Sequence, residues 1–161
     1  MMAIAISLAA VVVSLSAFLH GRWRDRRDLF LRINEHLVSP DQQHGRRLLY
    51  AMKEKPTPVK DLSAEDYLAI NNALAALNVL AIYYLRRYVP RKDVLELWAL
   101  PVLRALLAGD AFLAHRDAQQ GTPIWPQLRK LGKDAKQYAQ RERVSIQISG
   151  PTGEKIEPPV E

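Results

Sequence analysis

The clearest chemical pairing in the sequence is a carboxylate and an imidazole, Asp41 and His44, with Glu35 and His36 shortly before them. A spacing of three places the two groups on one face of a helix. A di-iron bundle needs such a pair, as Glu-x-x-His, on two helices and further carboxylates on the others. The chain has a single Asp-x-x-His, near an expected helix start where Asp is favoured for capping and dipole reasons. We therefore expect no metal site.

Other catalytic patterns point to no particular chemistry. The chain has no cysteine, no Gly-x-Ser-x-Gly turn and no glycine-rich phosphate loop. We expect no catalytic residues and no cofactor. Asn71 and Asn78 interrupt an apolar stretch and share a helical face. They either bond polar groups between helices or meet solvent, or they line a polar pocket or an oligomer-specifying position.

Basic residues form the strongest remaining signal. The net charge is +6 and the pI is about 9.7. The basic clusters are spread over four segments, residues 22–32, 46–47, 86–92 and 129–143. Nucleic-acid binding would favour one surface with a recognisable module, so a nucleic-acid partner is not expected. Each basic residue beside an anionic leaflet contributes about 1 kcal/mol, which makes membrane lipid the expected partner of these charges.

The apolar N-terminal run explains why lipid should be near. Residues 1–19 carry no charged side chain and cover about 28 Å as a helix, close to a hydrocarbon core of about 30 Å. Nine Ile, Leu, Val or Phe residues favour insertion by about 3 to 5 kcal/mol. A cleaved signal peptide is disfavoured because Ser14–Ser16 is a poor cleavage site. A soluble core helix is disfavoured because the run has no polar face.

The charges behind this run predict its orientation and its contact with the membrane surface. No Lys or Arg precedes the run, so the positive-inside rule puts the N-terminus outside and the following domain in the cytoplasm of a bacterial inner membrane. Trp23 lies where an interfacial aromatic belongs. The residues expected at the membrane surface are Arg22, Trp23, Arg24, Arg26 and Arg27.

Small residues recur along one side of the run at alternating steps of four and three. Such a stripe lets two transmembrane backbones approach closely, either from two copies of the chain or from different subunits. The alternative is that Ala and Ser are common in any membrane helix. The members of the stripe are Ala3, Ser7, Ala10, Ser14 and Ala17.

The rest of the chain predicts an all-α fold in three parts: a signal-anchor helix over 1–21, a cytoplasmic helical bundle over 22–141 and an extended tail over 142–161. The span should continue as helix to Val38. Ser39 and Gln42 predict a capping box for a second helix to about Lys53, followed by a loop over 55–62.

Three later helices are expected. Ser63, with Asp66 three residues on, opens a helix to Val89-Pro90. A fourth runs from Arg91 to about Gln119 and is kinked or restarted at Pro101. The last runs over 126–141. Residues 144–148 alternate like a short strand and could pair with 155–156. The apolar stripe of the third helix is Tyr67, Ile70, Leu74, Leu77, Ala81, Tyr84 and Tyr88.

Two stretches resemble an uncharacterised bacterial domain-of-unknown-function family of short membrane-anchored helical proteins. They are RRDLFLRINEHLVSPDQQHGRRLLYAM (residues 26–52) and NNALAALNVLAIYYLRRYVPRKDVLELWALPVLRAL (residues 71–106). The resemblance covers roughly residues 1–115 and implies an N-terminal span, a Ser-Pro break between helices and a later helix with an internal Pro. It implies no chemistry.

The function expected from the sequence is that of a single-pass membrane-anchored accessory or scaffolding protein, whose bundle meets a protein partner or a second copy of the chain. A membrane-tethered sensor of a small ligand or anionic lipid is the alternative. An enzyme of unknown type is the third possibility.

Overall fold

The structure is a computed structural model that describes residues 2–142, without the side chains of residues 2–10, 12, 13 and 19. In that part, 84% of residues are helical and no strand occurs, which confirms the all-α fold. A short 3-10 turn, η1 (Val59–Asp61), precedes the third helix. The helices are α1 (Met2–Leu37), α2 (Pro40–Glu54), α3 (Ala64–Leu85), α4 (Arg91–Ala108), α5 (Asp110–Gln120) and α6 (Pro126–Arg141).

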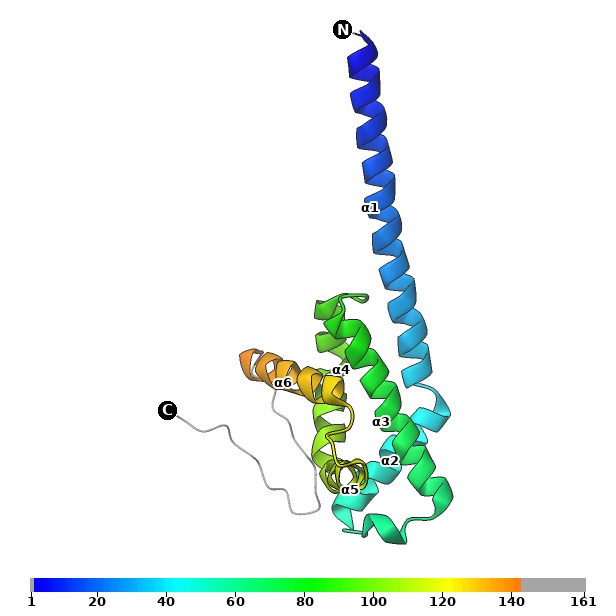
Figure 1. Cartoon of the computed structure of the whole chain (residues 1–161), viewed down its shortest axis with the longest axis vertical. Coiled ribbons are helices and arrows are strands. Elements are labelled where there is room, and N and C mark those ends of the chain that lie inside the picture. The colour runs from blue at the N-terminus through cyan, green and yellow to red at the C-terminus, as the bar shows by residue number, and fades with distance from the viewer. Residues whose placement is uncertain (1, 143–161) are drawn as a thin grey trace.

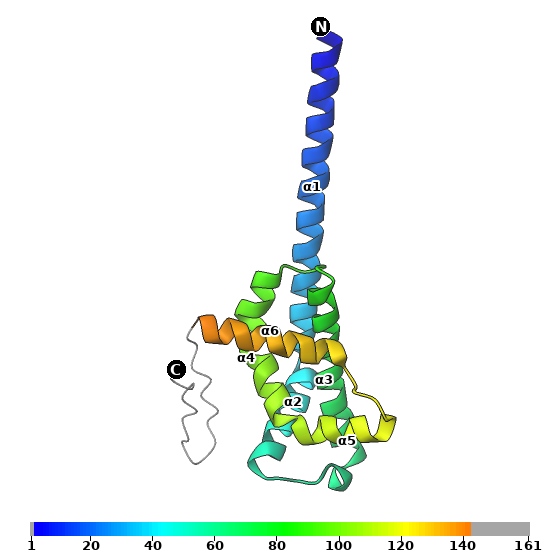
Figure 2. The same ribbon diagram turned by 60° about the vertical axis from the view of Figure 1, so that its left-hand side comes forward.

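The long helix α1 has two halves with different surroundings. Its first half stands away from the other helices in both views (Figures 1 and 2). Val11, Leu15 and Phe18 there are 62%, 56% and 60% exposed. In the second half, Phe30 and Leu37 are buried in the bundle core. One continuous helix therefore joins an unpacked apolar segment to a packed domain.

Helix α3 forms the centre of the bundle and packs against α1, α2, α4 and α6. Ile70, Leu74, Leu77 and Leu80 are fully buried, while Tyr67 is half-buried. Among the described residues, α3 is by length and composition apolar enough to cross a membrane, and 44% of its most apolar stretch is buried. The pair α4 and α5 passes the same test but bends by 66°. Packing on four helices accounts for the composition of α3.

Glycines permit close contact at two helix crossings, between α2 and α3 and between α4 and α6. A Cβ atom at Gly45 of α2 would collide with the carbonyl oxygen of Ala69 and lie 2.8 Å from the Cβ of Ala73, both on α3. A Cβ at Gly132 of α6 would collide with the side chain of Leu106 on α4. The core therefore depends on missing side chains as well as on apolar ones.

The expected helix starts are right in position but not always in chemistry. The Ser63 hydroxyl accepts a bond from the Asp66 N–H at 3.0 Å, as predicted. The capping box at Ser39 was a wrong prediction, because the Ser39 side chain makes no capping bond. Gln42 is buried instead, and the Gln43 amide donates to the carbonyl of Val38 at 2.6 Å. The Gln42 side-chain oxygen has no hydrogen-bond partner among the described residues, so it does not make the reciprocal bond of a capping box.

Two expected boundaries are also corrected. Helix α3 ends at Leu85 rather than at Val89, because Arg87 adopts the left-handed conformation with φ 59°. The break in the fourth expected helix falls at Gly109 rather than at Pro101. Pro101 removes only one backbone bond, to the carbonyl of Leu97 on the exposed side of α4. The predicted strand over 144–148 lies outside the described residues.

Candidate functional site

The segment of residues 22–27 in α1, here called the basic segment, lies between the two halves of that helix. Its four arginines and Trp23 are all exposed. The Arg22 guanidinium lies 5.8 Å from the ring centroid of Phe18, and that of Arg27 lies 5.8 Å from the Trp23 ring. These contacts run along the helix surface. The residues predicted at a membrane surface are therefore all exposed, directly after the unpacked half of α1.

The connection of residues 86–90, here called the α3–α4 turn, lies beside this segment. The Arg87 N–H donates to the Tyr84 carbonyl at 3.1 Å and the Tyr88 N–H to the Tyr83 carbonyl at 2.9 Å. This is a Schellman motif, which requires a left-handed residue, here Arg87. The Tyr83 and Tyr88 rings lie 5.9 Å apart. The motif fixes the direction in which the turn leaves α3.

A shallow hollow of about 230 Å³ joins the basic segment to the α3–α4 turn. Its walls are aliphatic, aromatic and charged, with two cations and one carboxylate. The lining residues are Arg22, Asp25, Arg26, Leu29 and Tyr88. No local pattern predicts this proximity, since residues 26 and 88 are far apart in the chain. Residues 86–92 were noticed as a basic cluster, but the pattern did not indicate that this cluster lies beside residues 22–27.

The two asparagines proposed for a polar pocket have different surroundings. The Asn78 side-chain oxygen accepts the backbone N–H of Leu128 at 3.1 Å. Leu128 lies in the first turn of α6, where backbone donors lack helical partners, so Asn78 caps α6 from α3. The Asn71 side-chain oxygen is buried and has no hydrogen-bond partner among the described residues. The structure thus gives Asn78 a structural role, which is the first of the alternatives stated for it.

A second set of contacts fixes α1 to the bundle. The Trp98 indole N–H donates to the side-chain oxygen of Asn34 at 3.1 Å. Arg46 donates to the carbonyl of Leu37 at 2.9 Å and lies 5.7 Å from the Trp98 ring centroid. Burial lowers the pKa of Arg46, partly offset by Tyr50. A cation at the C-terminus of α1 satisfies an orphan carbonyl and the helix dipole. These contacts therefore fix the second half of α1 to α2 and to α4.

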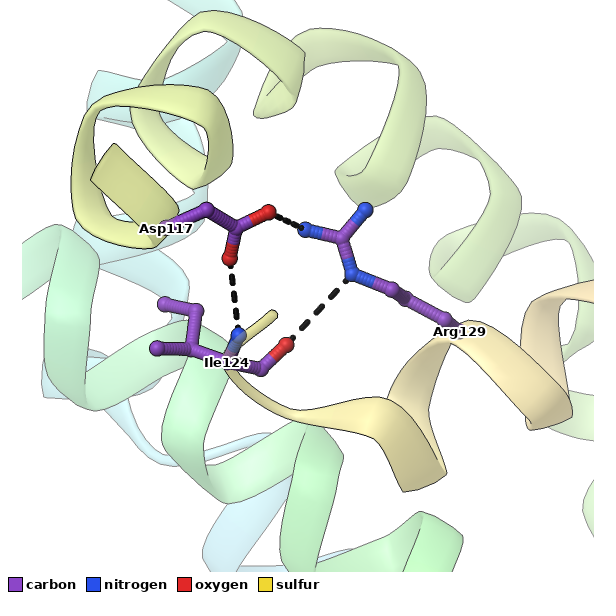
Figure 3. Close-up of polar contacts among 3 residues, drawn as sticks. All are labelled: Asp117, Ile124 and Arg129. Atoms are coloured by element: carbon purple, nitrogen blue, oxygen red, sulfur yellow. Dashed lines mark hydrogen bonds and ion pairs between the residues drawn. The ribbon is translucent and has the colours of Figure 1, made fainter. Parts of the chain in front are cut away.

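Polar contacts also join the last two helices (Figure 3). Asp117 of α5 accepts the Ile124 N–H at 2.7 Å and an N–H of Arg129 at 2.6 Å. The Nε of Arg129 donates to the Ile124 carbonyl at 3.4 Å. Both oxygens of the Asp117 carboxylate are therefore engaged in holding the loop between α5 and α6. We assign this cluster a structural role.

The remaining predicted residues can now be placed. The helical backbone of α1 puts the small residues at 3, 7, 10, 14 and 17 along one side, and Ser14 and Ala17 are exposed. Asp41, in the first turn of α2, and His44, one turn later, are both exposed. Within the described residues, no group of three His, Cys, Asp or Glu side chains could hold a metal ion.

Comparison with known proteins adds no assignment. No family model matches the chain, no curated protein matches it, and no solved structure matches it.

Proposed function

We propose that the chain is a single-pass membrane-anchored accessory or scaffolding protein, with the first half of α1 in the bilayer and the bundle in the cytoplasm. The observation that carries this proposal is the exposed apolar half of α1, which stands clear of the bundle and ends at the basic segment. Exposed Val11, Leu15 and Phe18 would be costly in water but are stable in hydrocarbon.

The accessory role rests on surfaces that the bundle leaves open. Leu68 and Val79 are 57% and 45% exposed and lie on one face of α3, which also carries exposed Asn72. The small-residue stripe of α1 is a second surface, which would pack against another transmembrane helix. We propose that one or both surfaces bind a subunit of a larger membrane assembly or a second copy of the chain.

Anchoring is tested with Val12→Arg. An arginine near the middle of the span costs about 2.5–3.5 kcal/mol, most of the gain from its apolar residues. The variant should leave the membrane fraction or fail to accumulate. Val38→Arg is the matched control, because it adds the same charge at an exposed position beyond α1. If Val12→Arg stays as firmly in membranes as the unchanged protein, α1 is not the anchor.

The accessory role is tested by purification in mild detergent. A companion protein at fixed stoichiometry is expected, and it should be reduced in Leu68→Ser/Val79→Ser or in Ala10→Leu/Ser14→Leu, according to the surface used. Leu107→Ser, at an exposed residue of α4, is the control. A monomeric protein that purifies alone from its native membrane would contradict the accessory role.

A further inference from the structure

We propose that the basic segment and the α3–α4 turn together form a docking surface for the phosphate groups of anionic membrane lipids, which holds the bundle against the bilayer. This inference rests on the proposed anchoring of α1 and adds a second, electrostatic attachment to it. The bundle would then have a defined orientation beneath the membrane rather than hanging from a single helix.

The position of the α3–α4 turn in the bundle supports docking to a bilayer. The α3–α4 turn lies at the end of the bundle from which α1 emerges, and the loop between α2 and α3 lies at the opposite end (Figures 1 and 2). Arg22, Arg26 and Tyr88, which line the hollow, belong to these two segments. A bilayer around the first half of α1 would therefore face both the basic segment and the turn.

The arginines of the α3–α4 turn and of the basic segment give this surface the charge that phosphate binding needs. Arg86 and Arg87 are exposed, and no ion pair within residues 2–142 involves either of them. The next two cations along the chain are engaged, Arg91 with Asp134 at 3.7 Å and Lys92 with Glu96 at 3.5 Å. The basic segment itself carries one carboxylate, that of Asp25, against four guanidiniums. Guanidinium groups bind phosphate through paired N–H donors, and this surface has an excess of them.

The distance of this surface from the apolar half of α1 matches the position of lipid headgroups. The polar layer on each side of a bilayer is about 5–8 Å thick. If the hydrocarbon ends near residue 19, a helix rise of 1.5 Å per residue places Arg22 about 5 Å and Arg26 about 10 Å beyond it. The hollow lined by both arginines therefore starts inside the headgroup layer. Tyr88 is 46% exposed there, as an interfacial aromatic should be.

The backbone conformation of the α3–α4 turn fixes the position from which Arg87 extends. Arg87 has φ 59°, a conformation that favours glycine, and the Schellman motif holds it there. The cation is thus carried by a fixed turn rather than by a frayed helix end. The same geometry offers a clean test, since Arg87→Gly removes the charge and suits the backbone.

The experiment uses the full chain in lipid nanodiscs made of phosphatidylcholine alone or with added phosphatidylglycerol. Because the chain has no cysteine, a single Leu97→Cys on exposed α4 can carry a donor dye, with acceptor dyes on the lipid headgroups. Energy transfer then reports how closely the bundle lies to the bilayer. The test variant is Arg86→Gln/Arg87→Gly. The control is Lys53→Gln/Lys55→Gln, which removes two charges at the far end of the bundle.

We expect higher transfer with phosphatidylglycerol than without it, and a loss of this difference at high salt. The test variant should lower the equilibrium constant for the docked orientation by about 30-fold, from about fivefold per arginine. The control should leave it unchanged. Replacing chloride by inorganic phosphate at equal ionic strength should preserve the difference, and its abolition would overturn the assignment to lipid.

The two proposals can fail separately in this experiment. A chain that does not co-purify with nanodiscs would contradict the anchoring and the docking together. A chain that inserts but shows equal transfer in neutral and anionic discs, or an unaltered response in Arg86→Gln/Arg87→Gly, would overturn the docking surface and leave the anchor standing.

Discussion

The Tyr84 hydroxyl links the central helix of the bundle to α6. It donates to the Asp134 carboxylate at 2.9 Å, and Arg91 lies 4.6 Å from its ring centroid. Burial first, and then the bond to Asp134, raise the pKa of Tyr84 to about 12, against the opposing effect of Arg91. The ionised form is disfavoured in the folded state, so this group stabilises the fold fully below pH 10. The contribution is lost as the pH rises through about 12.

Tyr84→Phe should therefore lower the free energy of unfolding by about 1–2 kcal/mol at neutral pH. The difference from the unchanged protein should shrink between pH 10 and about 12. Urea unfolding of the full chain in detergent at several pH values measures both effects. Tyr88→Phe, at an exposed ring, is the control and should change stability by less than about 0.5 kcal/mol. A difference that stays constant across this pH range would contradict the assigned bond.

Arg87 supplies a second prediction at the residue scale. An L-residue in the left-handed region is strained by about 1–2 kcal/mol, and part of this is recovered by glycine. Arg87→Gly should raise the free energy of unfolding by about 0.5–1 kcal/mol, measured by urea unfolding. The neighbouring Arg86→Gly should lower it by a similar amount, because Arg86 has an ordinary helical φ of −78°. Equal destabilisation by both would show that the turn is not a Schellman motif.

At the scale of helices, Gly45 gives the sharpest prediction. Gly45→Ala should destabilise the bundle by about 1–3 kcal/mol, since the added Cβ collides with the backbone of Ala69 and forces α2 from α3. Gly21→Ala is the matched control. It has nothing within 4 Å of its would-be Cβ and should stabilise α1 by up to about 1 kcal/mol. Circular dichroism and urea unfolding distinguish the two. A stabilising Gly45→Ala would mean that the α2–α3 crossing is looser than described.

The same helices show what a single sequence can and cannot predict. The Ser63 cap and the part of the apolar stripe from Ile70 to Tyr84 were predicted because both depend on residues within one or two turns of each other. The stripe was wrong at Tyr88, which lies beyond the end of α3 and is 46% exposed. The role of Gly45 was not, because a glycine in a helix looks only like a weak position until its neighbour is known. The bend at Gly109 was placed at Pro101 for a related reason. A proline signals a break locally, whereas the direction of α5 is set by packing.

The candidate site follows the same division. The basic segment was predicted from the charge pattern next to an apolar run. The α3–α4 turn was not, because its proximity to Arg22 and Arg26 arises from the packing of α1 on α3. The pairing of Asn78 with the start of α6 likewise joins residues 50 positions apart. Contacts between distant segments carry no local signature.

At the scale of the whole molecule, α1 joins an exposed apolar segment to the helical bundle. It is one helix from Met2 to Leu37, with exposed side chains at Val11, Leu15 and Phe18 and buried ones at Phe30 and Leu37. Asn34, Trp98 and Arg46 fix its second half to the bundle. A tilt or displacement of the apolar half of α1 would therefore act on the residues of α2 and α4 that contact its second half.

The most direct test is the location of the N-terminal end of α1 and of the bundle relative to the membrane. The cysteine-free chain allows single cysteines at Met2 and, in a separate variant, at exposed Thr122 of the bundle. In intact bacterial cells, a membrane-impermeant maleimide should label Met2→Cys, and should label Thr122→Cys only after the inner membrane is permeabilised. Labelling of both positions, or of neither, in intact cells would place them on one side and contradict a span through α1.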